Sequence, residues 1–399
     1  MGAVSAPSEF TQNQLREGFV ELAFGEPDPA LLPVGLVRDA ADRALMGSDA
    51  PAALAYGSTP GPQTLREAIA ARAAARERLE IGADDILVSG GISQALGQAL
   101  TDLARAGDAV FVESPTYNLA LGIFADHPVE LHGVPMDAEG LDVDALEAAV
   151  RAARAAGRRP RLLYTIPTFH NPTGVSLSPA RRARLLELAR REDLVVVEDD
   201  VYRELVFDGE APPALRALDP EAPVVRLGSF SKSLAPGLRL GWIDAPAALR
   251  ERLGADGVLE SGGCVSQFPA HVVAALLAAG AYAAHVAALR LAYASRRDAL
   301  AASLREHLPA GCTFTTPAGG FFLWVTLPKG LTASALLPVA ERHRVGFAPG
   351  IRFCADGDDR SLRLAFSLYD EEGLADGGRR LGAAVAEALR AVSAPRGAD

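Results

Sequence analysis

The stretch Val224-Val-Arg-Leu-Gly-Ser-Phe-Ser-Lys232, continued by Ser-Leu-Ala-Pro-Gly-Leu-Arg239-Leu-Gly-Trp242, decides the fold. An apolar run with strand character ends in a polar loop, Ser229 to Arg239, that carries hydroxyls, an amine and a guanidinium. These groups could hold a phosphate beside a lysine. A partly desolvated lysine near cations has a lowered pKa and can act as an amine nucleophile. The alternative is a polar loop with a solvated lysine.

Lysine is scarce in this chain. Lys and Arg together number 39, but only two of them are lysines, Lys232 and Lys329. Arginine cannot be deprotonated in a protein, so it cannot replace lysine as a nucleophile. Lys329 lies in Leu-Pro-Lys-Gly, which predicts a surface turn with a solvated charge. Lys232 is therefore the candidate reactive amine.

The region from about residue 85 to 245 alternates short apolar runs with amphipathic stretches. This alternation favours βαβ units and a mostly parallel sheet. After about residue 290 the pattern changes to that of a smaller α+β domain. Strands are expected over 86–88, 109–112, 162–165, 194–197, 224–227, 321–327 and 362–367, and helices over 94–104, 145–156, 179–190, 270–288, 289–308, 333–344 and 372–392.

We therefore expect an α/β fold with a large and a small domain. The large, ligand-binding domain covers 51–290, with a mostly parallel sheet sandwiched by helices, and the small α+β domain covers 291–399. Residues 1–50 are turn-rich apart from one helix and cannot fold alone. We expect this segment to pack with the small domain.

Polar or glycine-rich residues follow five of the expected strands. Ligands of open α/β sheets bind outside the carboxyl ends of the strands, so these residues predict one shared pocket. The five segments are Ser89-Gly-Gly91, Pro115-Thr-Tyr117, Asn171-Pro-Thr-Gly174, Asp199, and Ser229 to Lys232.

Two of these segments suggest specific chemistry. In Ser89-Gly-Gly-Ile-Ser-Gln94, a strand gives way to a helix start whose free backbone N–H groups suit a phosphate, although a plain tight turn would have the same pattern. Asp199 ends a buried run and lies on the same strand face as Val197. It could face a protonated ring nitrogen, or it could simply be a solvated carboxylate.

Composition excludes several function classes. The net charge of −11 and the pI of about 5.2 argue against a nucleic-acid partner. The longest apolar stretch, 272–284, is too short to span a bilayer, and the N-terminus has no signal-peptide pattern. Three widely spaced cysteines form neither a disulfide framework nor a zinc pattern and fit a reducing compartment. We expect a cytoplasmic protein with no membrane partner and no metal.

Taken together, the motifs resemble those of fold-type-I aminotransferases dependent on pyridoxal phosphate. The matching features are Ser-Phe-Ser-Lys with an arginine seven residues on, Asn-Pro-Thr-Gly about 60 residues before the lysine, and Asp-x-x-Tyr about 30 residues before it. The resemblance is strongest to the 2-aminoadipate and kynurenine aminotransferases and to the aminotransferase-like domain of certain winged-helix regulators. It covers about residues 24 to 366. One match is loose, because His170 stands where the family often has glutamine, and we assign it no role.

The resemblance implies a cofactor and a role for each matching residue. Lys232 would form a Schiff base with pyridoxal phosphate and shuttle protons, Asp199 would pair with the pyridinium nitrogen, and the Arg363 guanidinium would bind the substrate α-carboxylate. The remaining implied contacts are Asn171 and Tyr202 with the phenolate oxygen, Tyr117 stacked on the ring, Gly91, Ile92, Ser93, Gln94, Ser229, Ser231 and Arg239 with the phosphate, Tyr56 with the phosphate of the other subunit, and Gly25 and Asn171 beside the substrate. The protein would be a homodimer.

The reaction itself admits three interpretations. The first is an aminotransferase that moves an amino group between an L-α-amino acid and a 2-oxo acid. The second is a same-fold enzyme that breaks another bond, such as a β- or γ-lyase, a decarboxylase or an oxidase. The third is a ligand-sensing module without catalysis. We expect the first. The acidic charge, and the lack of room for a DNA-binding domain before the matching region, argue against the third, whereas the sequence does not show which bond breaks and so leaves the second open.

Overall fold

A computed structural model describes residues 15–46, 50–77, 79, 81–354, 357 and 359–393. Within these ranges, eight strands form the large sheet in the order β2-β9-β8-β7-β6-β3-β4-β5. The neighbouring strands β8, β7, β6, β3 and β4 are parallel to one another, while β9 runs antiparallel between β8 and β2. The bounds are β2 Ile86–Ser89, β3 Ala109–Ser114, β4 Glu130–Asp137, β5 Gly140–Leu141, β6 Pro160–Thr165, β7 Val195–Asp199, β8 Val224–Ser229 and β9 Gly241–Asp244.

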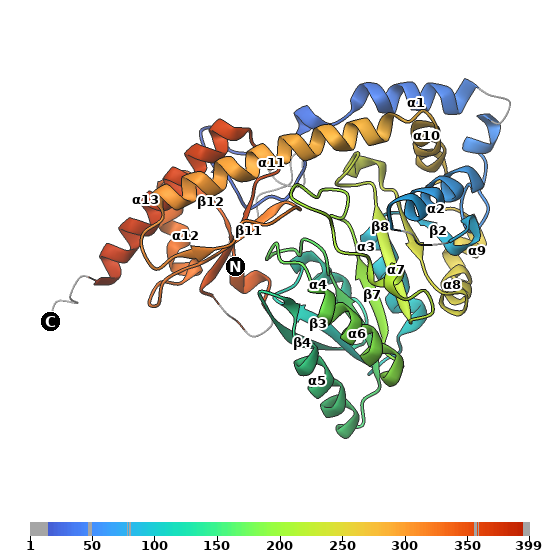
Figure 1. Cartoon of the computed structure of the whole chain (residues 1–399), viewed down its shortest axis with the longest axis horizontal. Helices are drawn as coiled ribbons and strands as arrows, with labels where there is room; N and C mark the ends of the chain where they lie inside the picture. The colour runs from blue at the N-terminus through green and yellow to red at the C-terminus, as the bar shows by residue number, and fades with distance from the viewer. Residues whose placement is uncertain are drawn as a thin grey trace.

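Helices cover both faces of the large sheet, as predicted for this fold class (Figure 1). One face packs on α3 (Ile92–Leu103), α4 (Asn118–Ala125) and α8 (Ala247–Gly254). The opposite face packs on α5 (Val143–Ala155), α6 (Pro179–Glu192) and α7 (Leu215–Leu218) at one end of the sheet, and on α2 (Gln63–Glu77) and α10 (Gln267–Ala278) at the other. The short helix α9 spans Gly257–Gly262. The sequence defines helix starts locally: the side chains of Asp142 and Ser178 cap α5 and α6 by accepting backbone N–H bonds.

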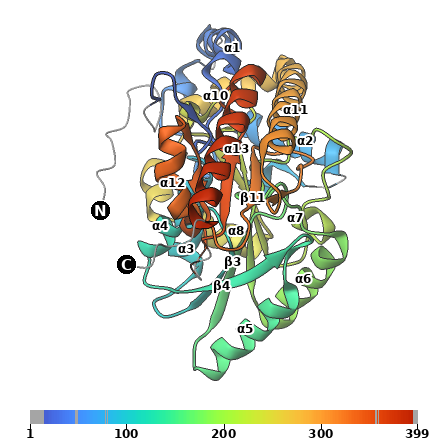
Figure 2. The same ribbon diagram turned by 90° about the vertical axis from the view of Figure 1, so that its left-hand side faces the viewer.

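The C-terminal part of the chain builds a second, smaller sheet in the order β10-β11-β14-β13. Helix α13 lies between α12 and α11 (Ala281–His307) and packs against both of them (Figure 2). The bounds are β10 Thr313–Phe314, β11 Phe322–Thr326, α12 Ala333–Arg342, β12 Val345–Gly346, β13 Ala348–Pro349, β14 Ser361–Ala365 and α13 Glu371–Ser393.

The N-terminal segment contacts both parts of the molecule. Strand β1 (Val20–Glu21) pairs in parallel with β12, in the C-terminal part of the chain. Helix α1 (Val34–Met46) instead packs against α10, at the far end of the molecule from α13 (Figure 1). Strand β1 therefore contacts the C-terminal part of the chain, whereas α1 contacts a helix that flanks the large sheet.

The predicted break between helices at 288/289 was wrong. The chain breaks at Gly280, which adopts φ +71°, a conformation that glycine reaches without strain, and α11 then runs unbroken from Ala281 to His307. The expected boundary at 290/291 falls inside this helix, which spans both predicted domains. Strands β4 and β9 were missed. The division into domains stays a prediction.

Within the described ranges, no single helix has both the length and the apolar composition to cross a membrane. Only α10 and α11 taken as a pair meet that test, and they are bent by 87° at their break.

Candidate active site

The five predicted loops gather at one edge of the large sheet. Because β9 is antiparallel to both neighbours, β2 points the same way as β8, so the carboxyl ends of β2, β3, β6, β7 and β8 share an edge. The short distance between Gly91, which follows β2, and Arg239, which follows β8, shows that these strand ends lie close together. A Cβ added to Gly91 would lie 3.1 Å from Nη2 of Arg239.

Lys232 lies in the turn after β8, and its amine reaches across to the N-terminal segment. Nζ donates a hydrogen bond to the Gly25 carbonyl at 3.0 Å and lies 5.6 Å from the centre of the Phe321 ring. Burial lowers the pKa of this amine to about 8; Arg363 and Arg239 lower it too, while Glu26 and Asp199 oppose the shift. The neutral fraction of this amine near neutral pH is therefore much larger than that of an ordinary lysine, and a nucleophilic lysine must be neutral.

The start of α3 forms an anion seat beside Arg239. Gly91 is the N-cap at φ +93°, and no described side chain caps this end, so the first N–H groups of α3, over Ile92, Ser93 and Gln94, are available. The Gln94 side chain is already engaged, because its oxygen accepts from the Gly90 N–H. Across the seat, Ser229 Oγ donates to Ser231 Oγ at 2.9 Å.

A close approach of backbones makes this seat possible. A Cβ on Gly241 of β9 would lie 2.6 Å from the Gly228 carbonyl oxygen and 2.9 Å from the Gly91 Cα. Side chains at Gly241 would therefore push the α3 start away from β8 and β9. The glycine in Leu-Gly-Trp242 thus holds the anion seat together.

Asp199 ends β7 on the face covered by α3 and α4. Its Oδ2 accepts a hydrogen bond from the Tyr164 hydroxyl at 2.7 Å, and its Oδ1 accepts from the Val201 N–H at 3.3 Å. Burial raises the pKa of Asp199 to about 7, although both hydrogen bonds lower it. The predicted alternative of a solvated carboxylate is wrong, because Asp199 is 3% exposed.

Tyr117 and Tyr202 lie close to this carboxylate. Burial, and next the charge of Asp199, raise the pKa of Tyr117, while Arg363 and Arg239 lower it. Burial likewise raises the pKa of Tyr202 far above its ordinary value, and the neighbouring Tyr117 and Asp199 raise it further. Both phenols therefore stay protonated hydrogen-bond donors at neutral pH.

Arg363 of β14 closes the site from the small sheet. Its Nη1 donates to Asn171 Oδ1 at 2.9 Å, and its Nη2 donates to the Ala23 carbonyl at 2.6 Å. The guanidinium is 4.2 Å from the ring centre of Phe322 and 4.8 Å from that of Phe353. Burial lowers its pKa only to about 10, so it stays a cation at neutral pH.

Two predicted residues are placed differently from the rest. Gly25 supplies its carbonyl to Lys232, whereas the segment's contact with Arg363 is made by Ala23. Tyr56 is 91% exposed on the surface of its own chain. A side chain this exposed does not line the buried site of its own chain, so within one chain Tyr56 adds nothing to it.

Sequence reasoning missed two groups at the site. Tyr164 was inside an expected strand, but the register that places it level with Val197 on the neighbouring strand left no signal in the sequence. The buried Glu113 carboxylate accepts from Thr165 Oγ1 at 2.7 Å and lies 3.0 Å from Nε2 of His170. Since His170 directly precedes Asn171, this pair supports the loop that presents Asn171.

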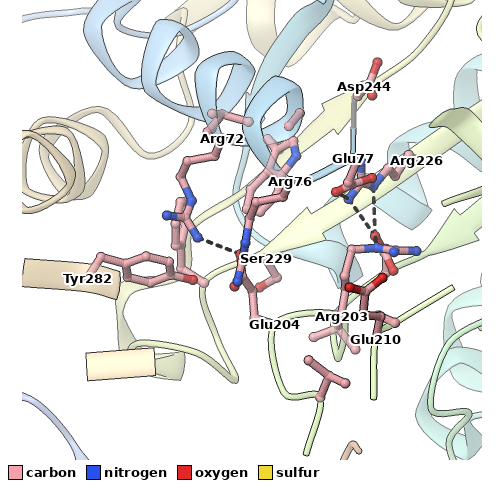
Figure 3. Close-up of a pocket in the computed structure, with 18 of the residues that line it drawn as sticks. Arg72, Arg76, Glu77, Arg203, Glu204, Glu210, Arg226, Ser229, Asp244 and Tyr282 are labelled. Atoms are coloured by element: carbon pink, nitrogen blue, oxygen red, sulfur yellow. Dashed lines mark hydrogen bonds and ion pairs between the residues drawn. The ribbon is translucent and has the colours of Figure 1, made fainter. Parts of the chain in front are cut away.

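A separate cavity of about 390 Å³ lies on the opposite sheet face, between α2, β8, β9 and the loop after β7 (Figure 3). Its charged side chains neutralise one another: Arg72 donates to Glu204 at 2.7 Å, and Arg226 bridges Glu77 at 2.6 Å and Asp200 at 2.7 Å. This network holds the residues that follow Asp199 against α2, and thereby supports the site from the opposite face of the sheet.

The donor set fits a pyridoxal phosphate. The group carries an aldehyde, a dianionic phosphate and a ring nitrogen, and the pocket offers a partly buried amine, an uncapped helix start with Arg239, and a buried carboxylate. The model of the class I and II aminotransferase family matches residues 18–376.

The chain belongs to this family.

Relatives of this aminotransferase match it over nearly its whole length. An aromatic-amino-acid aminotransferase of Thermococcus litoralis is 36% identical over 373 residues, covering 93% of this chain and 89% of the relative. A 2-aminoadipate transaminase of Thermus thermophilus is 36% identical over 376 residues, covering 93% and 91%. The crystal structure of Pyrococcus horikoshii kynurenine aminotransferase, complexed with PMP, superposes with a TM-score of 0.86 at 36% identity, covering 93% and 91%.

These findings confirm the predicted fold, cofactor class and reaction. The chain is an aminotransferase that depends on pyridoxal phosphate.

Proposed function

We propose that Lys232 is the residue that binds the cofactor covalently and moves the substrate proton during transamination. The observation that carries this proposal is the partly buried Lys232 amine, with a pKa of about 8, held 3.0 Å from the Gly25 carbonyl. The cofactor, when bound, supplies the electron-withdrawing ring that allows a Cα–H bond to lose its proton. Lys232 Nζ would then take up that proton and later give it back, which completes the transfer of the amino group.

The other residues of the site hold the cofactor in this proposal. Asp199 would accept a hydrogen bond from the ring nitrogen, Tyr117 would stack on the ring, and Asn171 and Tyr202 would bind its phenolate oxygen. The phosphate would bind to the α3 start (Gly91, Ile92, Ser93 and the Gln94 backbone), to Ser229 and Ser231, and to Arg239. The uncapped N–H groups and the guanidinium beside Gly91 support this assignment.

Arg363 would bind the α-carboxylate of the substrate. A guanidinium offers a planar fork that matches a carboxylate in a bidentate geometry. The rings of Phe322 and Phe353 and the bond to Asn171 hold this fork in one orientation. The orientation matters because it fixes which bond at Cα faces Lys232. Gly25 and Asn171 would border the bound substrate.

We also propose that the preferred amino donors have long side chains. The names of the three relatives refer to aromatic amino acids, 2-aminoadipate and kynurenine, all of which are longer than alanine or aspartate. The test is a half-reaction panel, in which the holoenzyme is mixed with each L-amino acid and the cofactor absorbance is followed. Rates on phenylalanine, kynurenine and 2-aminoadipate should exceed those on alanine and aspartate, and the reverse order would overturn the proposal.

The active enzyme would be a cytoplasmic homodimer with composite sites. Tyr56 is 91% exposed, and the apolar side chains of Leu54 (72%) and Met46 (82%) are also largely exposed, which supports an interface at this surface. Tyr56 would then reach the phosphate of the partner's site. Among the described residues, Cys264, Cys312 and Cys354 form no disulfide, which suits a reducing compartment.

Mixed dimers test the composite site. Co-refolded Lys232→Ala and Tyr56→Phe subunits should regain activity that neither variant has alone, because one site of each mixed dimer keeps both residues. No recovery in mixed dimers, or a monomeric mass by light scattering at assay concentration, would refute it.

A further inference from the structure

Tyr164 and Asp199 meet through neighbouring parallel strands. Strand β6 places Tyr164 level with Val197 of β7, and Asp199 follows two residues later on the same face. The Tyr164 hydroxyl donates to Asp199 Oδ2 at 2.7 Å, and the two residues are 1% and 3% exposed. We propose that Tyr164 is a positioning residue that keeps the Asp199 carboxylate ionised and aimed at the cofactor ring. This inference rests on the role proposed above for Asp199.

The direction of the hydrogen bond follows from the environment. Burial and the neighbouring Asp199 charge both raise the pKa of Tyr164 well above its ordinary value, so the phenol stays protonated. A protonated phenol facing a carboxylate can only donate, and a donor stabilises the ionised form of its acceptor. Tyr164 therefore opposes the burial that raises the pKa of Asp199.

The geometry also fixes where the carboxylate points. Tyr164 packs its ring edge-on against Phe124 of α4, with centroids 5.6 Å apart. Because α4 begins directly after Tyr117, the same helix anchors the ring that would stack on the cofactor. Each Asp199 oxygen has one fixed donor, Tyr164 on Oδ2 and the Val201 N–H on Oδ1, so the carboxylate cannot rotate freely.

Other charged and titratable groups surround Asp199. Glu113 of β3 and Asp200 raise its pKa, and its own charge acts on Tyr117, Tyr202 and Lys232. Glu113 has other donors, Thr165 Oγ1 and the Ile166 N–H, and Asp200 is paired with Arg226. Tyr164 is thus the one described side chain that donates a hydrogen bond to Asp199.

The experiment is a double-mutant cycle on cofactor affinity. Full-length enzyme depleted of cofactor is titrated with pyridoxal phosphate between pH 5.5 and pH 9, as wild type, Tyr164→Phe, Asp199→Asn and the double variant. Tyr164→Phe should weaken binding about 10- to 100-fold, the range expected when a hydrogen bond to a charged group is removed. Added to the Asp199→Asn variant, the same change should have little further effect.

The pH profile separates positioning from general structural damage. Without its hydrogen-bond donor, Asp199 should have a higher pKa than in the wild type. As the pH is lowered, Tyr164→Phe should therefore lose its affinity for pyridoxal phosphate earlier, at a higher pH than the wild type does. Tyr282→Phe is the matched control, because it removes an equally buried phenol bond, to Ser233 Oγ at 2.6 Å. The control should keep the wild-type profile.

Two results would overturn the inference. One is additive losses from Tyr164→Phe and Asp199→Asn; the other is a Tyr164→Phe profile no different from that of Tyr282→Phe. If the single variant Asp199→Asn binds pyridoxal phosphate as tightly as the wild type, the role proposed for Asp199 is refuted instead. The two failures are therefore distinguishable.

Discussion

Replacing Arg363 by alanine should disable the enzyme toward amino acids without releasing the cofactor. The Arg363 residue is 7% exposed, and its guanidinium keeps its charge at neutral pH and is held by Asn171, Ala23 and two aromatic rings. Removing one partner of a desolvated, charge-assisted bidentate pair costs about 2–5 kcal/mol, so kcat/KM should fall roughly 30- to 5000-fold. Arg363→Lys keeps the charge but not the fork, and should also be strongly impaired.

The assay compares each amino acid with the amine that lacks its α-carboxylate. Arg363→Ala and Arg363→Lys should lose rate on the amino acids and little on the amines, which have no carboxylate for the fork. Arg297→Lys is a suitable control, since Arg297 is a buried arginine that donates to the Pro317 carbonyl at 2.9 Å and lies 5.5 Å from the Phe207 ring. It should lower stability and leave kcat/KM unchanged. A parallel loss on amines and amino acids, or a loss below about threefold on amino acids, would refute the reasoning.

Three further outcomes are expected. In the cofactor-free enzyme, Lys232→Met should raise the melting temperature below pH 8, and this gain should vanish as the pH approaches 10.5. Between these pH values the unfolded wild-type chain binds more protons at Lys232 than the folded chain does, so the stability of the wild type rises with pH. Lys329→Met, at an exposed lysine, should show no such trend. Gly91→Ala should weaken the retention of pyridoxal phosphate in dialysis, because Gly91 has φ +93° and the new Cβ would meet Arg239. Gly97→Ala is the control inside α3, where a Cβ would meet only Ile123 at 3.9 Å. It should stabilise the fold by about 0.5–1 kcal/mol in denaturant titration. Asp199→Asn should stabilise the cofactor-free enzyme above pH 7, where the buried carboxylate would otherwise be charged, and the stability difference from wild type should disappear below about pH 4.

The sequence predicted those parts of the site that depend on chain order. Loops at the carboxyl ends of parallel strands must share an edge, so Gly91, Asp199 and Lys232 could be grouped from the order of their strands alone. The insertion of β9 between β2 and β8 could not be predicted, because a four-residue strand such as Gly241–Asp244 has too little pattern to reveal its pairing. The error at 288/289 arose from treating Gly280 as an interior helix residue.

Interactions between distant segments were beyond the sequence. Tyr164 reaches Asp199 only because β6 and β7 pair in one particular register, and Arg363 reaches Ala23 only because the N-terminal segment folds back on the small sheet. The motifs identified which residues carry the chemistry. Tertiary packing determines which neighbours orient them and shift their pKa values.

The central claim is that Lys232, of the two lysines in the chain, carries the cofactor, and borohydride reduction tests it most directly. The holoenzyme with one equivalent of pyridoxal phosphate per subunit is reduced, digested and mapped by mass spectrometry. The pyridoxyl group should be found on the peptide containing Ser229-Phe-Ser-Lys232, and Lys232→Arg should take up none. A label on the exposed Lys329, or stable labelling of Lys232→Arg at the wild-type level, would contradict the account.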